Sequence, residues 1–150
     1  MGYYKSRSGK EIIITFYNKK KYNLVKGYSG EFMEGRPYHV LELIDTKEKR
    51  LFVVNLHTGH GELCKKLYIQ GKLNKFLRET IDLGKNKLIV LGDFNNHNIK
   101  TLKVMGRNLR GSKKKYRNIV DNVLSEQKVY VKRYLKCELG SDHVGLVCEA

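Results

Sequence analysis

Five polar residues of the kinds used in phosphoester hydrolysis stand at the ends of apolar runs. His57 follows Phe-Val-Val-Asn-Leu, Asp93 and Asn95 follow an Ile-Val-Leu run, and Asp142 and His143 precede Val-Gly-Leu-Val. Carboxylate oxygens hold Mg²⁺ or deprotonate an attacking water, whereas imidazole and carboxamide groups stabilise charge on phosphoryl oxygens. No serine nucleophile elbow, zinc-binding His-Glu-x-x-His pattern or glycine-rich phosphate loop supports a different chemistry. The set favours metal-assisted hydrolysis of a phosphoester.

Each of these residues also has a structural explanation when it is taken alone. Asp93 could belong to a plain turn, His57 could be a core-edge histidine bonded to the backbone, and Asp142 could cap a helix or turn. The hypothesis therefore depends on the joint arrangement. Strand ends that face loops are where α/β folds place their sites.

The elements that must position these residues alternate between strands and a helix. Apolar residues at helical spacing, from Leu63 and Leu67 to Leu77 and Ile81, predict a helix over 62–82. Strands 11–17 and 22–28 are expected to pair across the turn at 18–21. The region 98–117 shows only a weak hydrophobic pattern. Strands are predicted at 11–17, 22–28, 38–45, 50–56, 87–92 and roughly 119–124, 128–134 and 144–148. This order indicates an α/β fold with a mixed sheet.

The charge balance points to a polyanionic partner. The 150 residues amount to one domain, and 30 Lys and Arg against 15 Asp and Glu give a net charge of +15. Such an excess attracts nucleic acid, although abundant lysine can also be a general compositional bias. We expect nucleic acid to contact Arg107, Arg110, Lys113, Lys114 and Lys115. The alternative is that these residues form a solvated charged loop.

The cysteines and the hydropathy pattern bear on the compartment. Cys64, Cys137 and Cys148 are odd in number and show no metal-ligand spacing, which is typical of reduced thiols in an intracellular protein, cytoplasmic or nuclear. The sequence has no apolar run long enough for a transmembrane segment.

Four short segments, in this order, resemble the endonuclease/exonuclease/phosphatase superfamily. They are Asn55-Leu56-His57, similar to its NxH motif; Gly92-Asp93-Phe94-Asn95, similar to GDFN; 120–124, similar to its IDYIL strand; and Ser141-Asp142-His143, similar to its terminal SDH motif. The segment Gly35-Arg36-Pro37 also falls where that family has a comparable one. The resemblance implies part of a four-layer α/β sandwich, with mixed β-sheets flanked by helices, of the DNase I-like kind.

The resemblance also implies roles on the phosphate side of the site. His57 would contact the scissile phosphate, and Asn55 and Asn95 would be further phosphate-binding residues. Asp93 would orient and activate the attacking water.

On the metal side, the resemblance places Asp142 at a Mg²⁺ or Mn²⁺ ion. His143 would bind the phosphate or stabilise the pentacovalent transition state. Asp121 would hydrogen-bond His143 and fix its tautomer.

The sequence departs from the family pattern at its start. Family members begin with a strand that carries an Asn, followed by a helix and a strand with the glutamate that is the principal metal ligand. Glu31 and Glu34 lie in a predicted loop, and Glu11 opens a different strand. Residues 1–150 are therefore expected to be a single, N-terminally incomplete domain, which a partner chain completes or which self-associates.

Three alternatives to a nuclease or other phosphodiesterase remain. The chain could be a non-catalytic remnant that binds phosphate or nucleic acid, or a fragment of a split hydrolase. It could also be a phosphatase acting on phosphoinositides or other phosphorylated small molecules.

Overall fold

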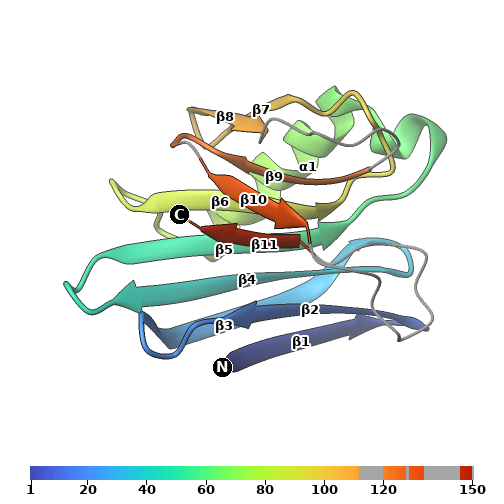
Figure 1. Ribbon diagram of the computed structural model, residues 1–150. Helices are drawn as coiled ribbons and strands as arrows, with labels where there is room; N and C mark the ends of the chain where they lie inside the picture. Colours follow the sequence, from blue (N-terminus) through green and yellow to red (C-terminus); the bar gives the residue numbers. More distant parts are fainter. Residues whose placement is uncertain (112–119, 128, 134–145, 150) are drawn as a thin grey trace.

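The computed structural model describes residues 1–111, 120–127, 129–133 and 146–149. Figure 1 shows long strands stacked beside one another, with the long helix behind them. The elements are β1 (Gly2–Ser8), β2 (Glu11–Tyr17), β3 (Tyr22–Met33), β4 (Arg36–Asp45), β5 (Arg50–His57), the 3₁₀ helix η1 (Gly61–Cys64), α1 (Lys66–Thr80), β6 (Lys87–Asp93), β7 (Thr101–Val104), β8 (Arg107–Gly111), β9 (Asp121–Ser125), β10 (Tyr130–Arg133) and β11 (Leu146–Glu149).

A seven-stranded mixed sheet forms the centre of the molecule, in the order β3-β4-β5-β6-β9-β8-β7. Within it β5 and β6 run parallel and are joined by the crossover helix α1. On either side, β4 pairs antiparallel with β5, and β9 pairs antiparallel with β6. Interior positions of β4 and β5 are buried on both faces, as expected for apolar strands at the centre of a sheet. The expected α/β class with a mixed sheet is confirmed.

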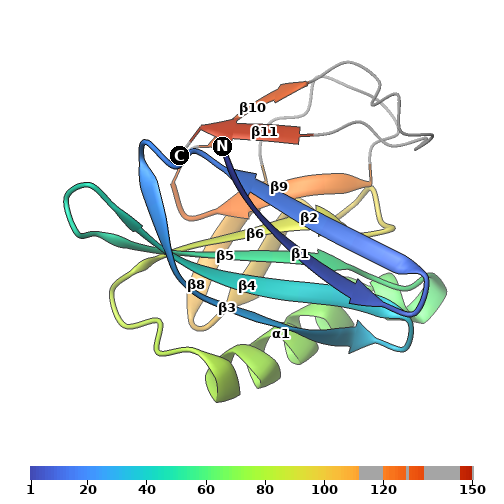
Figure 2. The ribbon, with the colours of Figure 1, turned by 90° about the horizontal axis from the view of Figure 1, so that it is seen from below.

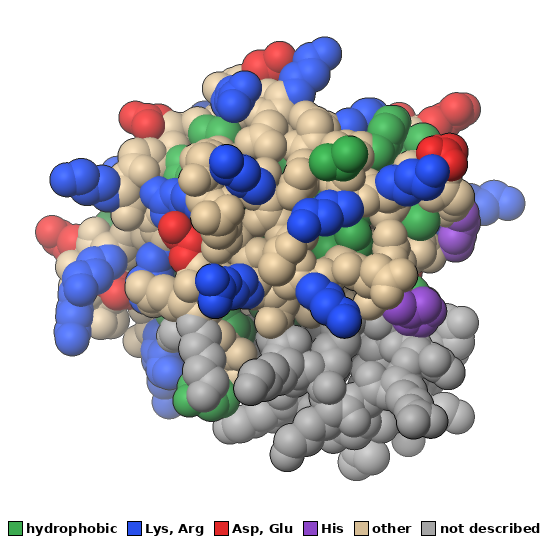
Figure 3. All heavy atoms as spheres, turned by 90° about the horizontal axis from the view of Figure 1, so that it is seen from above, with side chains coloured by type: hydrophobic (Ala, Val, Ile, Leu, Met, Phe, Trp, Pro, Cys, Tyr) green, Lys and Arg blue, Asp and Glu red, His purple; other side chains and the backbone are tan. Residues whose placement is uncertain are grey.

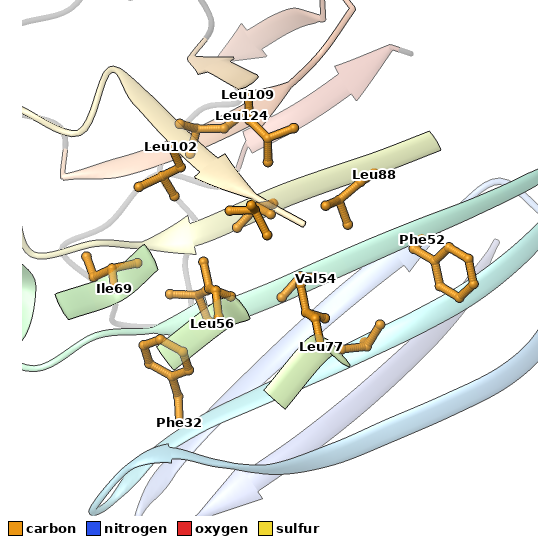
Figure 4. Close-up of a cluster of buried hydrophobic side chains, with 14 of the residues drawn as sticks. Phe32, Phe52, Val54, Leu56, Ile69, Leu77, Leu88, Leu102, Leu109 and Leu124 are labelled. Atoms are coloured by element: carbon orange, nitrogen blue, oxygen red, sulfur yellow. The ribbon is translucent and has the colours of Figure 1, made fainter. Parts of the chain in front are cut away.

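Helix α1 covers one face of this sheet. Its buried side chains, Ile69, Leu73 and Leu77, recur every four residues, so they form one stripe along the helix. They pack on residues of the central strands such as Val54 and Leu88, as Figure 4 shows.

The start of the helix differs from the sequence prediction. Leu63 and Leu67 were expected on the apolar stripe, but they are 40% and 79% exposed. The extended backbone of Lys65, with ψ 140°, separates η1 from α1 and breaks the helical phase. The stripe therefore begins only at Ile69.

Two small sheets, β1-β2 and β10-β11, lie on the opposite face of the central sheet from α1, as Figure 2 shows. A second apolar cluster fills the space beneath them. It includes Leu41, Val53 and Ile89 from the central sheet, with Tyr4 and Tyr17 of the β1–β2 hairpin packed against it. Helix, central sheet and a second β layer are thus three successive layers, as expected for part of a four-layer α/β sandwich.

The predicted pairing of 11–17 with 22–28 is wrong. The chain does turn at Asn18, whose carbonyl accepts from the amides of Lys21 and Tyr22. However, β2 pairs along its whole length with β1, whereas β3 joins the central sheet beside β4. A turn signal fixes where the chain reverses, but it does not fix which strand becomes the partner, which depends on contacts distant in sequence.

Two further hairpin strands lie within 98–117, where the sequence pattern was weak. In β7 and β8, Leu102, Val104 and Leu109 are buried and alternate with exposed polar residues. Each strand is short, and the turn between them uses positive φ at Met105 and Gly106. Strands this short carry few apolar positions, so the alternation is hard to recognise in sequence.

The outer face of the β1–β2 hairpin is apolar and exposed. Tyr3, Ile12, Ile14 and Phe16 are 66%, 49%, 44% and 62% exposed because alternate residues of a strand point to opposite faces. Self-association or capture of a partner chain through this face remains a prediction.

A buried polar network joins the β1–β2 hairpin to the central sheet. His39 of β4 is fully buried, with Nδ1 3.0 Å from Ser6 Oγ and Nε2 2.7 Å from Thr15 Oγ1. The Asn55 amide donates to the same Thr15 hydroxyl at 2.9 Å. Both ring nitrogens of His39 therefore have hydroxyl partners, which suits a neutral imidazole with one donor and one acceptor.

Stability should fall in mild acid because of His39. Burial lowers the pKa of His39 from 6.5 to about 4, so the unfolded chain takes up a proton more readily than the folded one. The contribution of this histidine is complete above pH 6.5 and decreases as the pH falls towards 4, by about 3 kcal/mol in the free energy of unfolding.

Urea unfolding at pH 7 and pH 4.5 measures this effect. His39→Gln should remove a large part of the pH dependence, whereas His60→Gln, at an exposed histidine, should leave it unchanged. The same pH dependence in wild type and His39→Gln would contradict the assignment.

Candidate active site

Parallel pairing of β5 and β6 places His57 beside Asp93 at the carboxyl ends of the two strands. The His57 Nε2 and Asp93 Oδ2 atoms are 3.4 Å apart, and the two side chains are 16% and 14% exposed. The imidazole and the carboxylate are therefore reachable from solvent yet largely shielded. Partial burial of this kind strengthens electrostatic interactions relative to those in water.

The backbone after β6 is held in a tight turn that fixes Asp93 and Asn95. Asp93 Oδ1 accepts from the Asn95 amide at 2.8 Å, and the Asn95 side chain donates to the Thr58 carbonyl at 2.7 Å. Asn95 has φ 46°, a left-handed conformation that Asn tolerates better than most residues. One of the two N–H donors of the Asn95 amide is thus engaged in tying this turn to the loop after His57.

Arg36 and Glu11 also reach the site, and the sequence analysis did not place them there. Arg36 Nη1 lies 3.1 Å from His57 Nε2 and 3.2 Å from Glu11 Oε1. Glu11 Oε2 lies 3.5 Å from His57 Nδ1. The imidazole is therefore surrounded by a guanidinium and two carboxylates.

The only sequence signal for Arg36 was its position in Gly35-Arg36-Pro37, and Glu11 had none. The sequence places Glu11 at the start of a strand other than the one that carries the family's metal-binding glutamate. It reaches His57 because β2 lies across the face of the central sheet, close to β4 and β5, a placement that depends on non-local pairing with β1.

Asn55 and Asp121 occupy flanking positions. Asn55 is buried, and its amide donates to Thr15 Oγ1 and, at 3.4 Å, to the Ile14 carbonyl, so it anchors β2 over the site. Asp121 lies directly opposite Asp93 in the β6–β9 register. Its expected partner His143, like Asp142, lies outside the described residues.

The residues expected to contact nucleic acid differ in their surroundings. Arg107 donates to the Gly84 and Asn86 carbonyls and pairs with Glu126 at 2.7 Å, so it ties the β8 strand to the loop before β6. Arg110 is exposed on the same strand, nearer the site. Lys113, Lys114 and Lys115 lie outside the described residues.

The described part of the chain does not by itself complete a metal site. Within it, no group of three or more His, Cys, Asp or Glu side chains is arranged to hold a metal ion. Glu11 and Asp93 offer oxygen ligands on either side of His57, but they do not make up such a set.

Several solved structures share this fold. The human Nocturnin catalytic domain superposes with a TM-score of 0.67 at 14% identity, covering 98% of this chain and 70% of that chain. An endonuclease/exonuclease/phosphatase family protein from Bacteroides thetaiotaomicron gives 0.61 at 13% identity, covering 98% and 70%. D. rerio TDP2, solved with a single-stranded DNA product, gives 0.58 at 14% identity, covering 97% and 75%. The chain therefore has the DNase I-like fold that its motifs suggested.

A sequence relative comes from a virus. An uncharacterised protein of Acanthamoeba polyphaga mimivirus is 34% identical over an alignment of 96 residues, and the match covers 57% of this chain. The chain spans 18% of the length of that curated relative. No family model matches the sequence. Among the described residues, no helix is long and apolar enough to cross a membrane.

Proposed function

We propose that this chain is a phosphoester hydrolase, most specifically a phosphodiesterase or nuclease that acts on nucleic acid. The observation that carries the proposal is the His57–Asp93 pair, 3.4 Å apart at adjacent ends of parallel strands. The Arg36 cation lies against the same imidazole. A base, a neutral donor and a cation that share one partly shielded position form a set suited to phosphoryl transfer.

The roles follow from the chemistry of each group. Asp93 is the general base that orients and deprotonates the attacking water. His57 and Arg36 donate hydrogen bonds to the non-bridging phosphate oxygens as charge develops on them. Asn95 positions Asp93 through its backbone amide and offers a second side-chain N–H to the phosphate.

Glu11 holds Arg36 and His57 before substrate arrives. Its two carboxylate oxygens contact the guanidinium and the imidazole, at 3.2 and 3.5 Å. A substrate phosphate competes for the same two donors. Glu11 is 44% exposed, so the cost of releasing it to water is small.

Dependence on Mg²⁺ or Mn²⁺ is a further part of the proposal. Such an ion would polarise a phosphoryl oxygen. The described residues do not assemble a complete ligand set, so the roles above involve only the chain's own groups. Asp142 remains the proposed ligand.

Nucleic acid is the proposed substrate because of the charge of the chain. A net charge of +15 favours a polyanion over a small phosphorylated molecule. That D. rerio TDP2 was solved with a single-stranded DNA product supports this choice. We also propose an intracellular location. The free thiol of Cys64 supports it.

Hydrolysis of bis(p-nitrophenyl) phosphate, with Mg²⁺ or Mn²⁺ and with EDTA, tests the function. We expect metal-dependent turnover that His57→Ala lowers about 10²–10³-fold, the usual effect of losing one charge-stabilising donor. His60→Ala, at an exposed histidine in the following loop, is the matched control and should retain full turnover. Wild-type protein without metal-dependent turnover would overturn the proposal in favour of a non-catalytic binding module.

A further inference from the structure

A cavity of about 250 Å³ lies between the start of α1 and the β7–β8 hairpin. We call it the α1–β7 cavity; its described lining residues are Lys66, Gln70, Thr101, Leu102, Lys103, Asn108, Leu109 and Arg110. Three of these eight are cations, and none is a carboxylate. Figure 3 shows the face that contains α1, β7 and β8, where Lys and Arg side chains outnumber Asp and Glu.

Because side chains alternate along β7 and β8, the polar side chains of the hairpin share one outward face. Thr101 pairs with Arg110, and Lys103 pairs with Asn108, across the antiparallel ladder. All four are exposed, whereas the intervening apolar residues face the core. Cross-strand neighbours on one face lie close enough to contact the same ligand.

Within the described ranges, no carboxylate forms an ion pair with the cations of this cavity. Lys66 Nζ donates to the Thr101 hydroxyl at 2.7 Å. None of the ion pairs between described residues involves Lys66, Lys103 or Arg110. Because a hydroxyl leaves the lysine charge uncompensated, an incoming phosphate gains a charge-assisted hydrogen bond without breaking an ion pair.

The cavity begins where the loops that leave the active site end. Lys66 opens α1 after the loop that follows His57, and Thr101 opens β7 after the turn that contains Asn95. The two loops are tied together by the Asn96 side chain, which donates to the Cys64 carbonyl at 2.8 Å. The Lys100 carbonyl in turn accepts from the Gly111 amide beside Arg110. Lys66 therefore lies where the loop from His57 ends, whereas the register places Arg110 level with Ser125 and Ile89, part-way along β6 from Asp93.

We propose that the α1–β7 cavity binds the phosphodiester backbone of a single-stranded nucleic acid whose scissile phosphate lies at His57 and Asp93. This inference rests on the proposed function and deepens it by naming contacts outside the reacting phosphate. Lys66, Lys103 and Arg110 bind successive phosphates, and the Thr101 and Asn108 side chains offer neutral hydrogen bonds. The small volume of the cavity, about 250 Å³, favours contact with one flexible strand over a duplex.

Equilibrium binding of a fluorescein-labelled oligo(dT) in EDTA, across a range of salt concentrations, tests this assignment. The test variant is Lys66→Glu/Lys103→Glu/Arg110→Glu. The matched control is Lys19→Glu/Lys20→Glu/Lys21→Glu, which changes net charge equally at an exposed turn at the far end of β2 from Glu11. A second variant, Lys66→Gln/Lys103→Gln/Arg110→Gln, removes charge without introducing repulsion, and thermal unfolding checks that each protein is folded.

We expect the plot of log K against log salt to become shallower by about two units in the test variant, because each lost contact to a single strand accounts for about 0.7. Affinity should fall at least about tenfold at low salt, and the control slope should stay unchanged. The glutamine variant should show the same change of slope with a smaller loss of affinity. Binding of heparin or of a duplex of the same sequence, which depends on overall charge, should weaken no more in the test variant than in the control.

An equal change of slope in the test and control variants would overturn the proposal, because it would show diffuse attraction. A loss of heparin or duplex binding in the test variant as large as its loss of oligo(dT) binding would overturn it as well. Binding in EDTA proceeds without turnover, so failure here leaves the hydrolysis result standing. Conversely, an inactive chain that binds oligo(dT) through this cavity would reject only the enzymatic proposal.

Discussion

Asp93→Asn is expected to lower the turnover of a phosphodiester about 10²–10⁴-fold, the range attributed to a positioned general base. The amide cannot accept a proton from the attacking water at neutral pH. The geometry of the turn should persist, since an amide oxygen can still accept from the Asn95 backbone amide that Asp93 Oδ1 now binds at 2.8 Å. The measurement is initial rate under saturating metal, with thermal unfolding to confirm the fold.

Asp82→Asn is the matched control for this substitution. Asp82 is exposed in the loop before β6, at the opposite end of that strand from Asp93. The same chemical change there should leave turnover within about twofold, because surface substitutions away from special features have small effects. Asp93→Asn with wild-type turnover would exclude Asp93 as the base.

Gly92→Ala should destabilise the protein by about 3–5 kcal/mol, a large part of the stability of a domain of this size. Gly92 has φ +136°, a region that side chains rarely adopt, and an added Cβ would lie 1.9 Å from the Leu56 carbonyl oxygen. Because Leu56 is the residue paired with Gly92 in β5, the backbones of the two strands would have to move apart. Those strands carry His57 and Asp93, so turnover should fall together with stability.

Gly71→Ala provides the control for adding a methyl group. Gly71 lies within α1, and a Cβ there would meet no atom within 4 Å. The substitution should raise the free energy of unfolding by about 0.5–1 kcal/mol, the usual gain from replacing glycine in a helix. Urea unfolding of both variants checks the pair, and equal destabilisation would refute the steric argument.

The central part of the fold could be predicted because the apolar pattern of its strands itself indicates that they are buried. Strands such as β5 are apolar on both faces. The dipeptide Gly92-Asp93 marks the end of β6 and the start of the turn. The structural matches confirm the DNase I-like fold that the motifs suggested. By contrast, β1 was missed because its buried positions are Gly2, Ser6 and Ser8, small residues that no apolar pattern marks.

The candidate site could be predicted only where its residues lie at ends of recognisable strands. His57, Asp93 and Asn95 are of this kind, and the structure brings them together. Glu11 and Arg36 join them through tertiary packing of β2 and β4 against β5. Nothing local distinguishes such a glutamate from any other at the start of a strand. Its role depends on hairpin placement, which the buried His39 network maintains.

Parallel pairing of β5 with β6 also has a consequence for the order in which the molecule folds. Parallel neighbours require a long crossover, so no contiguous short segment contains both His57 and Asp93. The entropy of closing that loop must be offset before the pair can meet, whereas the β3–β4 hairpin can form from neighbouring residues. During synthesis His57 emerges with its strand well before α1 and β6 follow. The site is therefore assembled late, when the crossover closes, and a nascent or prematurely terminated chain lacks it.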